Sequence, residues 1–139
     1  MEHANKKGFT LIEIMIAITI LGLLVGIAGY SVMNILENAK NKTTKQSLKG
    51  IQGNIKMFYS DTNVYPEKLI DLVKKPANEE VAANWGPSPY MEKEPVDGWG
   101  NKFVYKQTPD GENPYELYSN GPGGKKTAKK DRIDVWKLK

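Results

Sequence analysis

Residues 9–33 read FTLIEIMIAITILGLLVGIAGYSVM and contain a single charged side chain, that of Glu13. As an α-helix the segment is roughly 37 Å long, which is enough to cross the hydrocarbon core of a bilayer. Lys6 and Lys7 precede it, and basic residues beside a membrane span are typical of its cytoplasmic side. We therefore expect residues 9–33 to anchor the chain in a membrane, with its N-terminus in the cytoplasm.

The helical pattern continues beyond this apolar segment. Four apolar residues follow the three-and-four spacing of one helix face, and polar residues occupy the other faces. These residues are Leu48, Ile51, Ile55 and Phe58. The pattern predicts one helix from Phe9 to Tyr59 with a transmembrane half and an amphipathic half. Gly22, Gly26 and Gly29 form a stripe of small residues that favours close packing of another helix or local unwinding; the alternative is that they fill these positions without a special role.

The rest of the chain has the pattern of a small α+β unit. Pro66 can open a short helix that Pro76 ends, and an irregular stretch follows to Trp99. Residues 102–107 (KFVYKQ) and 115–119 (YELYS) partly alternate and flank the turn residues Pro109-Asp110-Gly111, which predicts a hairpin. Residues 133–136 are expected to add a third strand. The predicted fold is α+β, a long N-terminal helix packed on a small C-terminal antiparallel β-sheet.

The composition argues against an enzyme. The chain has 139 residues, no Cys, and a single His at position 3. It therefore offers no Cys/His zinc set, no Cys nucleophile and no histidine base in its C-terminal part. The formal net charge of +4 is too small to indicate a particular partner.

The sequence GFTLIEIMIAITILGLL, residues 8–24, resembles the N-terminal signature of type IV pilins and pseudopilins. The resemblance implies that residues 1–8 are a prepilin leader, that a prepilin peptidase cleaves between Gly8 and Phe9, and that the new N-terminal Phe9 is methylated. The family commonly has a proline where this chain has Tyr30. The helix near Gly26 could loosen on assembly without that proline, and a continuous helix is equally compatible with the residues.

Glu13 is the one ionisable residue in the apolar segment. A carboxylate there costs about 2.5–3.5 kcal/mol on insertion scales and therefore needs a partner. The amine that cleavage creates at Phe9 is such a partner when it belongs to a neighbouring helix displaced along the axis. Our hypothesis is that Glu13 neutralises the neighbour's Phe9 and sets the register of a filament. The alternative is a charge that is merely tolerated near the membrane edge.

The C-terminal part resembles the major pseudopilin of type II secretion systems. The matching tracts are NVYP at 63–66, PVDGWGN at 95–101 and LYSNG at 117–121, in the family's order. The absence of Cys also fits a pseudopilin better than a type IV pilin, which often closes this region with a disulfide. By itself, DGWGN at 97–101 has the chemistry of a tight turn with an aromatic anchor.

This resemblance implies a type IV pilin-like structural subunit of a periplasmic filament that drives protein export. Residues 9–33 are then the transmembrane and filament-core helix, and residues 34–139 the periplasmic domain. That domain comprises a helix continuation (34–59), a variable region (60–100), and the sheet with its C-terminal loop (101–139). The implied location is the inner membrane, with the C-terminal domain periplasmic. The implied partners are further copies of the chain, the prepilin peptidase, the platform protein, the secretion ATPase and minor pseudopilins.

Two other functions remain open. One is a type IV or competence pilin that adheres or takes up DNA, and the other is a membrane-anchored domain of different function. Five cations lie in the loop after the hairpin, and such side chains can neutralise phosphates. The loop has no aromatic side chain to stack on bases, so nucleic acid is not the expected partner. The cations are Lys125, Lys126, Lys129, Lys130 and Arg132.

The resemblance also implies calcium in the loop after the hairpin. The positions that match the family's ligands are the carbonyls of Leu117 and Ser119 and the carboxylates of Asp131 and Asp134. The sequence departs from the family in two ways, since Gly123 stands where an aspartate is usual and the two acids are three residues apart instead of two. The alternative is that a lysine or a lysine–aspartate contact holds the loop in the metal's place.

Overall fold

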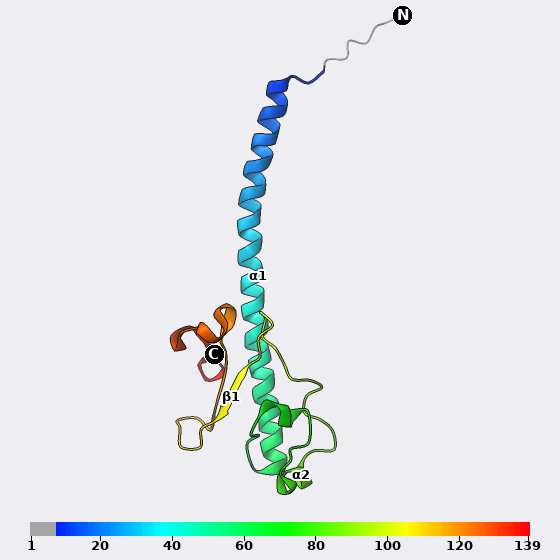
Figure 1. Cartoon of the computed structure of the whole chain (residues 1–139), viewed down its shortest axis with the longest axis vertical. Coiled ribbons are helices and arrows are strands. Elements are labelled where there is room, and N and C mark those ends of the chain that lie inside the picture. The colour runs from blue at the N-terminus through cyan, green and yellow to red at the C-terminus, as the bar shows by residue number, and fades with distance from the viewer. Residues whose placement is uncertain (1–7) are drawn as a thin grey trace, which may run out of the picture. The chain divides into compact units, whose positions relative to one another are not determined.

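The computed structural model describes residues 8–139, and its main element is helix α1, Leu11–Thr62, of 52 residues (Figure 1). The helix begins two residues after the predicted start and ends three residues after the predicted end. Its end is set by Asn63, which has a left-handed φ of 57° and whose N–H donates to the Tyr59 carbonyl at 2.8 Å. Asn is one of the few residues that tolerate this conformation, so it ends the helix as a C-terminal cap.

The chain divides into two compact units after Asn38. In the first unit the described part of α1 exposes its apolar side chains. The helix is continuous through Gly22, Gly26 and Gly29, and a Cβ at any of these glycines would meet nothing within 4 Å. The helix is therefore unbroken near Tyr30 in this structure. Its loosening on assembly stays a prediction.

The second unit, Ala39–Lys139, contains the three-stranded antiparallel sheet in the order β1-β2-β3. Strand β1 is Val104–Gln107, β2 is Tyr115–Ser119, and their register pairs Val104 with Tyr118. The predicted hairpin is confirmed, with a turn in which Gly111 N–H donates to the Thr108 carbonyl at 2.9 Å.

Strand β3, Ile133–Asp134, pairs with the end of β2 and is shorter than predicted. The chain then turns into the 3₁₀ helix η4, Val135–Lys137, so Trp136 is not in a strand as predicted. The physical reason is the Asp134 carboxylate, which accepts the Trp136 N–H at 3.0 Å and caps η4.

The core of the second unit joins one face of α1 to the sheet and the segments around it. The four predicted residues of the amphipathic face are all buried, at 0 to 1% exposure. The other members of the cluster are Leu69, Leu72, Phe103, Tyr115, Leu117 and Val135. The α+β class and the packing of the amphipathic half of the helix on a small antiparallel sheet are confirmed.

The segment between α1 and the sheet differs from the prediction in two places. The helix expected after Pro66 is one 3₁₀ turn, η1, Leu69–Leu72, which starts where the Lys68 N–H donates to the Asp71 carboxylate at 2.9 Å. The stretch expected to be irregular contains α2, Glu79–Asn84, capped by the Asn78 side chain. Two further 3₁₀ helices, η2 (Gly121–Lys126) and η3 (Lys129–Asp131), form the loop between β2 and β3.

Candidate functional site

The first described residues include the predicted processing site. Gly8 and Phe9 precede α1 in irregular backbone, and the Phe9 side chain is 85% exposed. The peptide bond between them therefore lies outside the helical hydrogen-bond ladder. Residues 1–7, which contain most of the predicted leader with Lys6 and Lys7, lie outside the described residues.

Thr10 and Glu13 form a capping box at the start of α1. The Glu13 carboxylate accepts the Thr10 N–H at 2.7 Å and the Thr10 hydroxyl at 2.9 Å, and the Glu13 N–H is directed at the Thr10 hydroxyl at 3.3 Å. These reciprocal bonds satisfy donors that a helix start leaves unpaired. Sequence reasoning missed the role of Thr10, although the T-x-x-E spacing before an apolar run is the signature of such a box. In this single chain Glu13 contacts its own helix start, and its pairing with a neighbour stays a prediction.

The apolar surface that follows is the most extensive exposed feature of the first unit. Its large side chains are 50 to 85% exposed from Phe9 to Leu36. Among the described residues, α1 is the helix that is long and apolar enough to cross a membrane. A soluble protein does not leave a contiguous apolar surface of this size open to water, so the surface is built to meet lipid or other helices.

In the second unit the DGWGN tract forms a buried polar junction with β2. Asp97 is 5% exposed. One of its carboxylate oxygens accepts the N–H groups of Trp99 at 3.0 Å and Asn101 at 2.9 Å, and the other accepts the Ser119 hydroxyl at 2.6 Å. The Ser119 hydroxyl oxygen in turn accepts the Gly121 N–H at 2.9 Å. The tract is thus a tight turn, as predicted, and it also holds the end of β2.

The same tract rests directly on α1. Gly98 N–H donates to the buried Thr44 hydroxyl at 2.9 Å, and that hydroxyl donates to the Lys40 carbonyl at 2.8 Å. A Cβ on Gly98 would lie 2.5 to 2.9 Å from the backbone of Lys40. Only glycine therefore allows the turn to approach the helix this closely.

The four residues of the predicted calcium site lie on β2, η3 and β3. Leu117 and Ser119 are completely buried in β2. Asp134 is paired with Tyr118 across the sheet and caps η4, as described above, while Asp131 is exposed at the end of η3. The sheet brings Ser119 close to the β3 segment through its pairing with Ile133. Within residues 8–139, no group of three or more Asp, Glu and His side chains is arranged to hold a metal.

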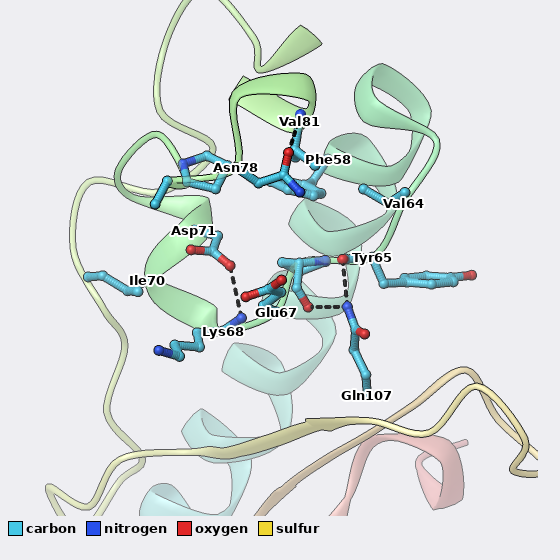
Figure 2. Close-up of a pocket in the computed structure, with 13 residues that line it drawn as sticks. Phe58, Val64, Tyr65, Glu67, Lys68, Ile70, Asp71, Asn78, Val81 and Gln107 are labelled. Carbon is cyan, nitrogen blue, oxygen red and sulfur yellow. Dashed lines mark hydrogen bonds between the residues drawn. The ribbon is translucent and has the colours of Figure 1, made fainter. Parts of the chain in front are cut away.

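A surface hollow lies where the chain leaves α1 (Figure 2). Its polar side chains brace the local backbone. Gln107 donates to the carbonyls of Tyr65 at 2.7 Å and Pro66 at 2.9 Å, and Asn78 accepts the Val81 N–H at 3.3 Å. Close by, the Tyr105 hydroxyl donates to the Pro66 carbonyl at 2.7 Å, and burial of the ring raises the pKa of Tyr105. These contacts attach the segment after α1 to the sheet.

Comparison with known proteins assigns the family. Residues 31–137 match the family described as type II secretion system (T2SS), protein G, and residues 3–29 match the prokaryotic N-terminal methylation motif. The chain is 36% identical over 138 residues to a type II secretion system core protein G of Pseudomonas aeruginosa, covering 97% of this chain and 96% of the relative. It is 32% identical to the core protein G of Escherichia coli K12, covering 96% and 93%.

A solved structure agrees with this assignment. The crystal structure of the major pseudopilin from the type 2 secretion system of enterohaemorrhagic Escherichia coli superposes with a TM-score of 0.64 at 26% identity, covering 76% of this chain and 94% of that one. Fold, N-terminal motif and C-terminal domain therefore match one family along nearly the whole chain. The chain belongs to the protein G family of type II secretion systems, the pseudopilus subunits.

Proposed function

We propose that the chain is cleaved between Gly8 and Phe9, methylated at Phe9, and polymerised with copies of itself into a periplasmic filament that drives protein export. The methylation motif supports the processing step, as does the position of the Gly8–Phe9 bond outside the helix. The proposed domains are the leader at 1–8, the membrane and filament-core helix at 9–33, and the periplasmic domain at 34–139.

The observation that carries the proposal is the exposed apolar surface of α1 in the first unit. Its side chains are covered by lipid before assembly and by neighbouring helices in the filament. Because both surroundings are apolar, the hydrophobic free energy changes little on transfer. Small residues and polar contacts then decide how neighbouring helices pack.

Glu13 supplies the polar contact in this proposal. The carboxylate lies in the first turn of α1 and is held there by Thr10. In the processed chain the Phe9 amine of a neighbour is a cation that it can pair with. A charge pair in an apolar surrounding tolerates little displacement, so the contact fixes the axial offset between subunits.

The proposed location is the inner membrane, with the N-terminus cytoplasmic and the C-terminal domain periplasmic. Extraction from lipid needs an external energy source, and the sequence contains no P-loop motif. The secretion ATPase and platform protein are therefore proposed partners, together with the prepilin peptidase and minor pseudopilins. No catalytic role is proposed for a family of structural subunits.

Processing is tested by the intact mass of the membrane-extracted chain, produced with and without a prepilin peptidase. The expected mass with the peptidase is that of a chain starting at Phe9 plus one methyl group. A mass that still starts near Met1 beside an active peptidase contradicts the proposal.

The role of Glu13 is tested with three variants in a filament assay. Glu13→Leu removes cap and charge, Glu13→Gln keeps an acceptor for the Thr10 N–H without the charge, and Glu112→Leu removes a carboxylate from the exposed hairpin turn. We expect both Glu13 variants to insert and be processed but to form few filaments, while Glu112→Leu assembles normally. Normal filaments from Glu13→Gln refute the charge pair and leave the capping box as the required feature.

A further inference from the structure

The loop between β2 and β3 is closed at its neck by a threonine. The Thr127 hydroxyl donates to the Asn120 carbonyl at 2.6 Å, and the Thr127 N–H donates to the Gly124 carbonyl at 3.0 Å. Asn120 directly follows β2, so the hydroxyl bond ties the far side of the loop back to the sheet, and the N–H bond closes the turn from Gly124 to Thr127. We call these two bonds the Thr127 latch.

Gly123 leaves room for the latch. A Cβ at Gly123 would overlap the Thr127 hydroxyl oxygen. Gly123 is also the position where the family resemblance implies an aspartate. In this chain the Thr127 hydroxyl occupies the space that the Cβ of that aspartate would need.

Three of the oxygens at the base of the loop take part in hydrogen bonds within the protein. The Ser119 hydroxyl is bonded to Asp97 and to Gly121 N–H, and the Gly121 carbonyl accepts from the Asn101 side chain at 3.3 Å. The Asp134 carboxylate caps η4. Among the buried side-chain acceptors of the described residues in this loop, the Asn120 oxygen is the one without a hydrogen-bond partner. Calcium takes six to eight oxygens, so this buried side-chain oxygen alone does not make a site.

The charge in the loop also opposes a divalent cation. Five cations accompany the two carboxylates of Asp131 and Asp134, and like charges at short range repel. Arg132 lies over the ring of Tyr118, with its guanidinium carbon 4.5 Å from the ring centroid. A cation is thus already held against β2 by an aromatic face.

We infer that this chain closes its β2–β3 loop without a metal, through the Thr127 latch, the Asp97–Ser119–Gly121 bonds and the stacking of Arg132 on Tyr118. The donor set does not fit calcium, and the contact that fills its place is made by threonine and arginine rather than by lysine. The inference does not depend on filament formation, because it concerns the folded chain before assembly.

The first test compares the full-length chain in detergent micelles in two solutions, one with about 1 mM calcium and one with EGTA. A calcium concentration of about 1 mM is roughly a hundred times the Kd of a site of about 10 µM affinity, so such a site would be filled. Thermal unfolding is followed by tryptophan fluorescence, and loop opening by the rate of tryptic cleavage at Lys125, Lys126, Lys129 and Lys130, which are exposed. We expect the Tm to agree within about 1 °C and the cleavage rate to be unchanged. A Tm that falls by several degrees in EGTA, or faster cleavage there, overturns the inference.

The second test removes the hydroxyl bond of the latch and leaves its backbone bond in place. Thr127→Val should raise the cleavage rate about fivefold in both solutions, which is the change in open population that one net hydrogen bond supplies. Thr108→Val is the matched control, because it removes a threonine bond of 2.8 Å to the Asn113 carbonyl in the hairpin turn. It should leave cleavage in the β2–β3 loop unchanged. Cleavage of Thr127→Val at the wild-type rate would show that the latch does not hold the loop.

A third variant tests whether Gly123 makes room for the latch or only lacks the carboxylate of a calcium ligand. Gly123→Asp supplies the carboxylate that the family resemblance implies. On our inference it displaces Thr127 and speeds cleavage with or without calcium. Protection of this variant by calcium, to or below the wild-type cleavage rate, would show that the other ligands are in place and would overturn the statement that the remaining donor set does not fit calcium.

Discussion

Replacing Asp97 by alanine should be among the most damaging single changes in the second unit. The carboxylate is 5% exposed and accepts three hydrogen bonds, from Trp99 N–H, Asn101 N–H and the Ser119 hydroxyl. Each buried donor left unpaired costs about 1–3 kcal/mol. Two of the donors are in the turn itself and regain water when it loosens, so we expect a total loss of about 3–5 kcal/mol.

Asp97→Asn keeps the shape of the side chain and removes its negative charge. Its side-chain oxygen can keep the two backbone bonds, and only the acceptor for the Ser119 hydroxyl is lost. We expect a loss of about 1–2 kcal/mol for this variant. Asp110→Ala, in the exposed hairpin turn, is the control and should change stability by less than about 0.5 kcal/mol.

The assay is urea unfolding of the full-length chain in non-ionic detergent, followed by tryptophan fluorescence. Trp85, Trp99 and Trp136 all lie in the second unit, so the signal reports that unit and not the apolar half of α1. A loss of about 3–5 kcal/mol is a large share of the 5–15 kcal/mol typical of a domain. An Asp97→Ala variant within about 1 kcal/mol of wild type would refute the idea that this junction holds the turn to the sheet.

Three further predictions concern the backbone and pH. Gly98→Ala should destabilise the second unit by about 2 kcal/mol or more, because its Cβ meets the Lys40 backbone. Gly53→Ala, on an open face of α1, should stabilise the unit by about 0.5–1 kcal/mol. The same urea assay measures both variants, and equal effects would contradict the close approach of Gly98 to the helix. Asn63→Gly should be neutral or stabilising and Asn63→Ala destabilising by about 1 kcal/mol, since only the latter strains the left-handed φ. Burial raises the pKa of Tyr105. The contribution of this neutral side chain to the free energy of unfolding is therefore fully present below the unfolded pKa of about 10 and is lost as the pH rises above it. Tyr105→Phe should be less stable at neutral pH, where it lacks the bond to the Pro66 carbonyl, but should lose less on alkaline titration; an unchanged slope would count against the burial effect.

The long helix and the hairpin could be predicted because their signals are local. An unbroken apolar run and the three-and-four spacing of Leu48 to Phe58 define one helix, and alternation around a Pro-Asp-Gly turn defines the hairpin. Helix α2 could not be predicted from periodicity because its six residues carry one large apolar side chain, that of Val81, which is too little for a repeating pattern; the N-cap residue Asn78 is its one sequence signal. The third strand was predicted too long because the capping role of Asp134 competes with strand pairing.

In the candidate sites too, contacts between residues close in sequence could be predicted and contacts between distant residues could not. The processing site at Gly8 and Phe9 stays a prediction from the N-terminal motif. The Thr10–Glu13 box could have been predicted from the sequence because its partners are three residues apart. The Asp97 junction was predicted only as a turn. Ser119 lies 22 residues from Asp97, and Thr44 lies 54 residues from Gly98, so no local sequence pattern predicts these contacts. The Thr127 latch spans seven residues of a loop whose path depends on left-handed glycines, so it too required the structure.

The sequence separation of these contacts has a consequence for how the chain folds. The Thr44–Gly98 bond closes a segment of 54 residues, and Val135, close to the C-terminal end, is buried in the core. Contacts between residues far apart in sequence form late, because the entropy of closing the intervening chain is lost before the contacts are gained. The second unit therefore cannot complete its core until β3 and η4, which are close to the C-terminal end, have been synthesised. During that interval the apolar face of α1 that later lies against the sheet is exposed, and this is the stage at which the chain is most prone to aggregation.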